Sequence, residues 1–344
     1  MSVNYRDQAR SLSCLPNPLA FPPQPAGPSA RLTGGMLLIM VIFLLMVSSV
    51  VGGQEDTADP QELATAYQAA HAAANFTEAL AIAEQLHELA LVAHIKALYQ
   101  VAAMHCRLGH EDQAYHWLEE CLAAGFWDFR QLREDEDFQS ISDDDRFKKL
   151  IRSAWSRQYI AMLERKERDA FQKPDQVMET LALQPGEKVA DIGAGSGYFT
   201  IPVARAVGPE GVVWAIDIRP EMLDHLRERL KGEELDNVRL MQVEKDDPQL
   251  PDGRVDTILM IDTLHYVQDR TAYARKLREG LAPGGRVIII DYRPKPWEER
   301  PWGPPPVQQI PRETIDAEFA AAGLKPVRVH EFLPEQYFVE YTAE

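Results

Sequence analysis

Cysteine is scarce in this sequence and confined to its first part. The 344 residues include three cysteines, Cys14, Cys106 and Cys121, and none follows residue 121. Their odd number and their spacing match no zinc-binding template, and we expect no metal site. Any chemistry in the C-terminal half must therefore proceed without a thiol. Cys106 and Cys121 lie in helical patterns, which predicts that they are small buried core residues.

Positive charge is also in short supply. Lys and Arg number 36 against 53 Asp and Glu, which gives a formal net charge of −17. Nucleic-acid binders need a positive surface that displaces counterions from phosphates, so the balance argues against a nucleic-acid partner. The remaining composition, 45% apolar and 26% charged residues, is that of a globular protein, and the length predicts two domains or one large one.

Apolar periodicity is missing from residues 1–35, which are rich in proline, serine and glycine and are predicted to be disordered. Charge is missing from the sixteen residues that follow, 36–51, and flanking glycines extend this segment to 36–53. A membrane-spanning helix needs about 17 to 20 apolar residues, and a signal-peptide core has about 7 to 15. Residues 36–53 are therefore predicted to be a transmembrane anchor or a signal peptide.

Three arginines, Arg6, Arg10 and Arg31, precede this apolar segment, whereas acidic residues follow it. The positive-inside rule places the N-terminus in the cytoplasm and the rest of the chain outside. We therefore expect a protein that is membrane-anchored through residues 36–53 or exported.

Residues 57–152 follow a helical pattern rich in Ala, Leu, Glu and Gln. Two similar stretches place Ala79 and Ala114 35 positions apart, close to the tetratricopeptide period of about 34 residues. Ala102 and Cys121 occupy further small-residue positions of such a repeat. This region resembles a degenerate tetratricopeptide pair, which would offer a surface for a protein partner. A plain helical bundle without a partner remains the alternative.

Two more helices are predicted after the repeat. Residues 129–150 are expected to form a single capping helix. Residues 155–171 form a mixed-charge helical pattern that Pro174 is expected to end, because proline cannot continue a helix.

Beyond Pro174 the sequence pattern changes and predicts short apolar strands that alternate with helices. The strand 188–192 contains Asp191, and Gly193-Ala194-Gly195-Ser196-Gly197 joins it to a helix that starts at Tyr198. Such a turn lets a ligand contact backbone N–H groups at a helix N-terminus. The dinucleotide fingerprint Gly-x-Gly-x-x-Gly would need a glycine where Tyr198 stands. A carboxylate at Asp191 repels a pyrophosphate but suits the ammonium group of a methionine moiety, so the loop favours S-adenosylmethionine over NAD.

The second strand, 212–216, ends on Asp217, 20 residues past Gly197. This is close to the position at which a ribose-binding acid follows a glycine loop, and its carboxylate can accept from both ribose hydroxyls. Asp217 can also cap the helix that begins near Pro220, and the two roles are compatible.

Three stretches together carry a family resemblance: VADIGAGSGYFT, AIDIRPEML and LAPGGRVIIIDY. They resemble the motif series of class I S-adenosylmethionine-dependent methyltransferases, most closely the group of ubiquinone/menaquinone-biosynthesis C-methyltransferases and many unassigned small-molecule enzymes (type 11/25-like). The resemblance covers roughly residues 168–344. It implies an α/β domain over 155–344 with a Rossmann-like, doubly wound, mostly parallel seven-stranded sheet, preceded by the all-α helical-repeat domain at 57–152.

The resemblance implies that S-adenosyl-L-methionine is the cofactor. The positions it assigns to cofactor binding are Asp191, Gly193, Gly195, Gly197, Asp217, Ile218, Asp246 and Asp262. Asp191 and the glycines would hold the methionine end, Asp217 the ribose, and Ile218 would lie against the adenine. An acid after the third strand, 239–243, would meet the adenine amino group; Glu244, Asp246 and Asp247 all follow, and Asp246 is favoured.

The fourth strand, 257–261, ends in Asp262 and is followed by His265. Ligands of open α/β sheets bind outside the carboxyl ends of the strands, so cofactor and acceptor should meet here. His265 is the candidate general base, since an imidazole titrates near neutrality. Packing beside the cofactor without proton transfer is its alternative role.

The last part of the chain is predicted to complete the sheet. Residues 281–285 form a structural turn before the fifth strand, 286–290, and residues 327–332 and 336–341 form a closing hairpin. Between them, 294–306 contains six prolines and is expected to be either a substrate lid or a stiff surface loop.

The expected reaction is methyl transfer to a small-molecule or lipid-like acceptor, which the sequence does not identify. No Asn-Pro-Pro-Tyr or Asp-Pro-Pro-Tyr run is present, which argues against amino-methylation of DNA bases. The missing C-terminal thiol argues against arsenite and thiol-dependent C5-pyrimidine enzymes.

Two other functions stay open, and so does the topology. Residues 195–200 also resemble the isoaspartyl O-methyltransferase loop, so a protein methyltransferase could recruit its substrate through the helical repeats. A catalytically inactive cofactor-binding scaffold is the other alternative, and an NAD oxidoreductase is the weakest. S-adenosylmethionine is made in the cytosol whereas the arginines place the body outside, so the side of the membrane is open.

Overall fold

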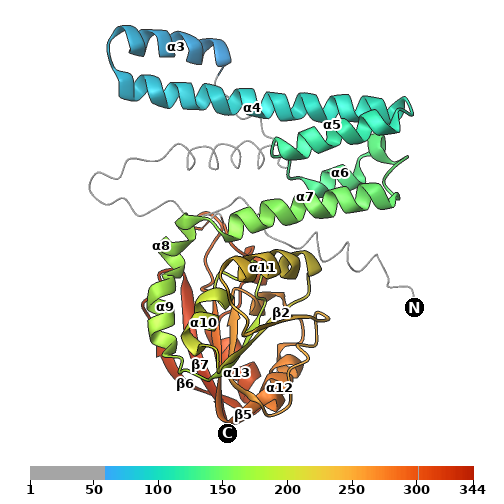
Figure 1. Ribbon diagram of the computed structural model, residues 1–344. Helices are drawn as coiled ribbons and strands as arrows, with labels where there is room; N and C mark the ends of the chain where they lie inside the picture. Colours follow the sequence, from blue (N-terminus) through green and yellow to red (C-terminus); the bar gives the residue numbers. More distant parts are fainter. Residues whose placement is uncertain (1–58, 301) are drawn as a thin grey trace. The chain divides into compact units, whose positions relative to one another are not determined.

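The computed structural model describes residues 59–300 and 302–344 (Figure 1). The chain divides between Gln158 and Tyr159 into two compact units. The predicted disordered segment 1–35 and the apolar segment 36–53 lie outside the described residues.

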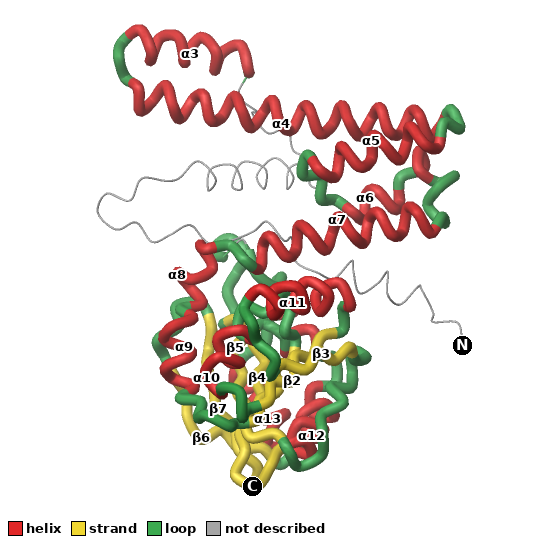
Figure 2. The backbone as a smooth tube through the Cα atoms, viewed as in Figure 1, coloured by secondary structure: helices red, strands yellow, loops and turns green. Residues whose placement is uncertain are grey.

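The first unit is built from helices alone in its described part (Figure 2). Its helices are α3 (Pro60–Ala72), α4 (Phe76–Arg107), α5 (Glu111–Ala123), α6 (Phe129–Glu134), the 3-10 helix η1 (Glu136–Phe138) and α7 (Asp145–Leu163), which continues past the division. α4 contacts both α3 and α5. By length and composition, α4 is the one described helix that could cross a membrane, a test that core helices also pass.

The tetratricopeptide interpretation of this unit is not confirmed. The two similar stretches do begin helices, α4 at Phe76 and α5 at Glu111, but α4 then runs unbroken for 32 residues. A pair of two-helix repeats would place a turn within that length. The small residues Ala102, Ala114 and Cys121 are buried, as expected where α4 meets α5.

The two described cysteines are core residues, as predicted. Cys106 and Cys121 are free and buried, and Cys121 donates to the Ile95 carbonyl of α4 at 3.6 Å. Burial raises the pKa of Cys121 to about 12, so this thiol is inert near neutrality.

The predicted single helix over 129–150 is wrong: Asp128 caps its first residue, but Asp135 ends α6 and starts η1. Asp128 accepts from the Gln131 N–H at 2.8 Å, and Asp135 accepts from the Asp137 N–H at 2.8 Å. Side-chain caps of this kind start new helices, so α6, η1 and the beginning of α7 share the stretch.

The role predicted for Pro174 is also wrong. The mixed-charge helix breaks earlier, into the end of α7, η2 (Lys166–Arg168) and α8 (Asp169–Gln172). Lys173 then takes a left-handed conformation with φ 44°, and Pro174 begins α9 (Pro174–Leu181). Proline suits the first position of a helix because that N–H has no partner within the helix.

The second unit is organised around a mixed sheet of seven strands. The strands are β1 (Lys188–Ile192), β2 (Val212–Asp217), β3 (Val238–Gln242), β4 (Val255–Ile261), β5 (Leu281–Tyr292), β6 (Leu324–His330) and β7 (Gln336–Ala343). Their order is β3-β2-β1-β4-β5-β7-β6. β1 to β5 run parallel, and β7 pairs antiparallel with β5 and β6. The predicted Rossmann-like fold and its closing hairpin are thus present.

Helices cover both faces of this sheet, which explains why its central strands are continuous apolar runs. The helices are α9, α10 (Thr200–Val207), α11 (Pro220–Gly232), α12 (Arg270–Gly280) and α13 (Arg312–Ala320), with short 3-10 turns η3 (Leu264–Tyr266) and η4 (Pro306–Gln308). Alternate residues of β1 face opposite ways: Ala190 and Ile192 pack in the cluster with α12 and α13, and Val189 packs in the cluster with α9 and α10.

The turn predicted at 281–285 lies within β5 as a bulge. Val255 pairs with Leu281 and Thr257 pairs with Arg286, so four residues of β5, 282–285, fall opposite one residue of β4. Gly284 within the bulge has φ 80°, a conformation that glycine adopts freely. The chain thereby keeps its strand direction while accommodating Pro283.

Candidate functional site

The glycine loop after β1 is held against β2 by its own backbone. The N–H groups of Gly193 and Ala194 both donate to the Ile216 carbonyl, at 2.8 and 3.1 Å. Gly193 and Gly197 have φ of 79° and 88°, which strongly favours glycine. A Cβ atom on Gly193 would lie 2.2 Å from Thr263 Oγ1, so the loop also needs glycine to approach the end of β4.

Gly197 shows how tightly the loop is packed. A Cβ here would lie 2.3 Å from Cδ1 of the buried Leu226. We expect Gly197→Ala to lower the free energy of unfolding by about 2–5 kcal/mol, from left-handed strain of about 1–2 kcal/mol and overpacking of about 1–3 kcal/mol. Gly186→Ala is the matched control, since Gly186 has φ 85° and open space around it. Urea unfolding of both variants should show the larger loss for Gly197→Ala; equal losses would contradict the packing argument.

Asp191 is buried inside the loop, near the end of β1. Its Oδ2 accepts from Thr200 Oγ1, at the first turn of α10, at 2.5 Å. Burial raises the pKa of Asp191 to about 6, the Asp217 charge raises it further, and the Thr200 bond opposes the rise. Burial disfavours the negative charge of this carboxylate, so a cation bound next to it would stabilise it.

This burial has a consequence for stability. Asp191 has a pKa of about 6 in the folded protein against the ordinary 3.8, so the folded state binds more protons between about pH 4 and 6. Stability therefore falls as pH rises through that window, by up to about 3 kcal/mol. Asp191→Asn should raise the free energy of unfolding of the cofactor-free protein at pH 8 and leave it nearly unchanged at pH 4. Urea unfolding at both values tests this, and a gain of equal size at pH 4 would contradict it.

Asp217 ends β2 and braces the loop. Its two carboxylate oxygens accept from the N–H groups of Gly195 and Arg219, each at 2.9 Å. Burial raises its pKa, and these two bonds oppose the rise. A carboxylate has about four acceptor sites, so it retains capacity for two ribose hydroxyls. The neighbouring Ile218 is 41% exposed, an apolar surface suited to a flat ring.

The acidic residues after β3 differ in whether their carboxylates are already paired. Asp247 pairs with Lys276 at 3.2 Å and accepts from the Gln249 N–H at 3.0 Å. Asp246 and Glu244 are exposed; the Asp246 carbonyl accepts from Lys276 Nζ at 2.9 Å, and the Glu244 carbonyl accepts from the Asp247 N–H at 3.1 Å. The Asp247 carboxylate is already paired, which is consistent with the choice of Asp246 over Asp247; the contact of Asp246 with the adenine amino group stays a prediction.

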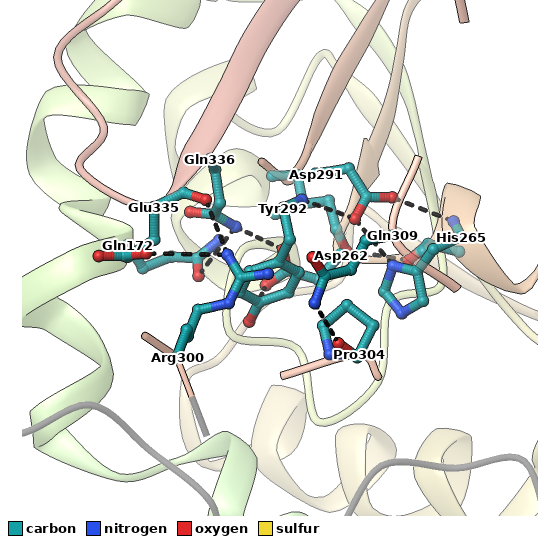
Figure 3. A network of polar contacts seen from close by, with 12 residues as sticks. Gln172, Asp262, His265, Asp291, Tyr292, Arg300, Pro304, Gln309, Glu335 and Gln336 are labelled. Atoms are coloured by element: carbon teal, nitrogen blue, oxygen red, sulfur yellow. Dashed lines mark hydrogen bonds and ion pairs between the residues drawn. The ribbon is translucent and has the colours of Figure 1, made fainter. Parts of the chain in front are cut away.

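Asp262 follows β4 with φ 54° and lies in a network of polar side chains (Figure 3). It accepts from Gln336 Nε2 and, at 3.4 Å, from the Tyr292 hydroxyl. Burial raises its pKa to about 6, opposed by the nearby Arg168 guanidinium.

Arg168 is a functional candidate that sequence reasoning missed. Its side chain is 9% exposed, with Nη2 3.7 Å from Asp262 Oδ2. Its guanidinium lies 4.1 Å from the centre of the Tyr198 ring, directly after the glycine loop. It is thus a buried cation next to the predicted methionine site. The only signal for it was its position at the start of the family resemblance.

His265 and Asp291 form a buried pair at the ends of β4 and β5. His265 Nδ1 lies 2.8 Å from Asp291 Oδ1, and the His265 N–H donates to Asp291 Oδ2 at 3.0 Å. A carboxylate accepts only, so the bond assigns the imidazole proton to Nδ1 and leaves a lone pair on Nε2. Figure 3 shows the second ring nitrogen pointing away from Asp291. This arrangement is the one that the predicted general-base role of His265 requires.

The proline-rich segment 294–306 packs back on the unit, although residue 301 lies outside its described part. The buried Trp302 ring lies 4.8 Å from Phe171 and 5.8 Å from Tyr292, centre to centre. Gln309 holds both ends of the segment, accepting from the Lys295 N–H at 2.7 Å and donating to the Pro304 carbonyl at 2.8 Å. Across residues 59–300 and 302–344, no group of three or more His, Cys, Asp or Glu side chains is arranged to hold a metal ion.

Known proteins share these features. Residues 190–287 match a family described as a methyltransferase domain, and residues 93–162 match one described as the N-terminal domain of A/B hydrolase-like proteins. A solved S-adenosylmethionine-dependent methyltransferase from Aquifex aeolicus is 28% identical with a TM-score of 0.50, over 54% of this chain and 97% of that one.

Curated relatives point the same way. The ubiquinone/menaquinone biosynthesis C-methyltransferase of Vibrio campbellii is 32% identical over 32% of this chain and 42% of its own. The demethylmenaquinone methyltransferase of Geobacillus sp. is 28% identical over 34% of this chain and 50% of its own. The chain thus spans at most half the length of these relatives. Residues 190–287 of the second unit thus match a methyltransferase domain, and the unit has the fold of class I S-adenosylmethionine-dependent methyltransferases, as the resemblance predicted.

Proposed function

We propose that this protein transfers a methyl group from S-adenosylmethionine to a small acceptor of the quinol type, an aromatic ring bearing a hydroxyl group. The observation that carries the proposal is the position of the His265–Asp291 pair at the same strand ends as the glycine loop and Asp262. The names of the curated relatives favour a quinone-type acceptor.

The residues present fit the cofactor. Asp191, short of positive charge, would hold the methionine ammonium, and Arg168 would hold its carboxylate. Asp217 would accept from the ribose hydroxyls, and Ile218 and Asp246 would contact the adenine. When bound, the sulfonium supplies an activated methyl group, so the protein mainly has to align the acceptor with it.

His265 would remove a proton from the acceptor. Its Nε2 lone pair takes the proton of an aromatic hydroxyl, and Asp291 stabilises the imidazolium that forms. The ionised acceptor is a stronger nucleophile at its oxygen and at the neighbouring ring carbons. When a ring carbon takes the methyl group, that carbon then loses its own proton to solvent, and the imidazolium returns its proton to the acceptor oxygen. Membrane attachment through residues 36–53 belongs to this proposal, because a lipid-like acceptor resides in the membrane.

Turnover on defined acceptors tests the proposal. The full chain, in detergent, would be incubated with methyl-labelled S-adenosylmethionine and a set of hydroxylated aromatic compounds, among them a short-chain demethylmenaquinol, with the fully methylated menaquinol as the matched control. We expect label in at least one compound of the set and none in the control. If a folded, cofactor-binding protein labels neither this quinol nor other hydroxylated aromatic compounds, the proposed acceptor class is wrong.

A further inference from the structure

Arg300 is buried and incompletely paired, and neither the glycine loop nor the His265–Asp291 pair explains it. Its side chain is 1% exposed, yet Nε and Nη2 have no hydrogen-bond partner among residues 59–300 and 302–344. Only Nη1 is engaged, donating to the Glu335 carbonyl at 3.3 Å. A buried charged donor without an acceptor is costly, so these two atoms require an acceptor from a bound molecule.

The charges around Arg300 are unbalanced. Its carboxylate neighbour, Glu335, has Oε2 3.7 Å from Arg300 Nη1, but the same oxygen is 2.7 Å from Lys295 Nζ. Two cations therefore share one anion. Asp262, the next acid in the network, is already close to Arg168. The Tyr292 and Trp302 rings, 4.9 and 5.6 Å from the guanidinium carbon, cover it without supplying a full negative charge.

The two unpartnered atoms of Arg300 define the shape of the missing partner. Nε–H and Nη2–H lie along one edge of the planar guanidinium and point in parallel, which matches the two oxygens of a carboxylate. A compact point anion would use only part of this edge.

Gln172 and Gln336 are also incompletely bonded in the same network (Figure 3). Both are 0% exposed, and Gln336 Nε2 donates to Gln172 Oε1 at 3.5 Å. Gln172 Nε2 has no acceptor and Gln336 Oε1 has no donor among the described side chains. A carboxylate would serve the first and an adjacent hydroxyl the second.

We infer that Arg300, with Gln172, binds a carboxylate group of the methyl acceptor. The inference rests on the proposed function, since it assigns this group to the acceptor of the same site. The link to the reaction is Tyr292, which lies under Arg300 and directly follows Asp291, the partner of His265. The acceptor class narrows accordingly, to hydroxylated aromatic acids.

Calorimetry on the full chain saturated with S-adenosylhomocysteine tests this inference. The probes are 4-hydroxybenzoate and the neutral 4-hydroxybenzamide. We expect the acid to bind at least about 10-fold more tightly, as for one charge-assisted bidentate contact. Arg300→Met should abolish this preference, and Arg300→Lys should restore only part of it, because an ammonium cannot form the fork. Lys295→Met, which removes the other cation at Glu335, should leave the preference intact.

Thermal unfolding separates a binding role of Arg300 from a structural one. If Arg300 serves a ligand, Arg300→Met leaves the Tm of the ligand-free protein unchanged or raises it, because a buried, incompletely paired charge is removed. The inference would be overturned if Arg300→Met had a lower Tm and the unaltered protein bound acid and amide equally well. It would also be overturned if Arg300→Met still bound the acid as tightly as the unaltered protein does. If S-adenosylhomocysteine fails to bind, the proposed function fails, and the same titrations without it still decide the role of Arg300.

Discussion

Replacing Asp217 by alanine is expected to weaken S-adenosylhomocysteine binding by about 100-fold. Two ribose hydroxyls donating to one carboxylate are together worth about 3 kcal/mol, which corresponds to that factor. The same substitution removes the acceptor that holds the Gly195 N–H at 2.9 Å, so the loop also loses a brace. The measurement is a calorimetric titration of the folded variant.

Asp256→Ala is the matched control for this experiment. Asp256 also accepts from a backbone N–H, that of Lys188 at 2.9 Å, but at the opposite end of β1. Its loss should leave the affinity within about twofold of the original, since it removes no contact to the cofactor. Similar weakening in both variants would mean that Asp217 acts through general stability, and unchanged affinity in Asp217→Ala would refute the ribose assignment.

Replacing His265 by asparagine is expected to lower the rate of methyl transfer by about 100- to 10,000-fold, the usual contribution of a positioned base. The asparagine amide can still donate to Asp291, so the variant removes the basic nitrogen while keeping the internal hydrogen bond. Affinity for S-adenosylhomocysteine should not change. Single-turnover rates and calorimetry on the same preparation separate the two effects.

His330→Asn provides the control for His265. His330 Nε2 lies 2.6 Å from Glu340 Oε1, a histidine–carboxylate pair of the same kind between β6 and β7. His330 lies on β6, the outermost strand, with β7, β5 and β4 between it and β1, so the rate of His330→Asn should stay close to that of the unaltered protein. Asp291→Asn should slow transfer as His265→Asn does, because the correct imidazole tautomer is lost. A normal rate in His265→Asn would show that the histidine only packs beside the cofactor.

The sheet and the cofactor loop were predictable because short, local patterns determine them. An apolar strand, an acid and a glycine turn specify the end of β1, and a second apolar strand ending on Asp217 specifies β2. Both patterns lie within stretches of a few residues. The predicted positions Asp191, Gly193, Gly195 and Gly197 accordingly lie in one continuous stretch at the end of β1, and Asp217 bonds to that stretch from the end of β2.

The polar network around Asp262 could not be predicted from the sequence. Its members come from η2, α8, β5, the proline-rich segment and β7, so no spacing along the chain brings Arg168, Gln172 and Gln336 to one place. Arg300 was equally hidden, because a charged residue in a proline-rich segment is normally exposed. Only the folded geometry shows that it is buried.

The predicted helix boundaries were wrong for a different reason. Periodicity detects apolar faces but not the capping bonds at helix ends, so the cap at Asp135 divided a stretch that was expected to be continuous. In α4 the error has the opposite sign. The spacing of small residues resembles a repeat of two short helices joined by a turn, whereas Phe76–Arg107 forms one unbroken helix.

The central claim, that the second unit binds S-adenosylmethionine, is tested most directly by calorimetric titration of the full chain with S-adenosylhomocysteine. Gly195→Arg is the control, since Gly195 has φ 53° and even a Cβ there would lie 3.1 Å from Leu163 Cδ1. We expect saturable binding with a dissociation constant on the order of micromolar, lost in the control. A folded protein that shows no binding would contradict the claim that the second unit binds S-adenosylmethionine. The inactive scaffold would then be the hypothesis to test next.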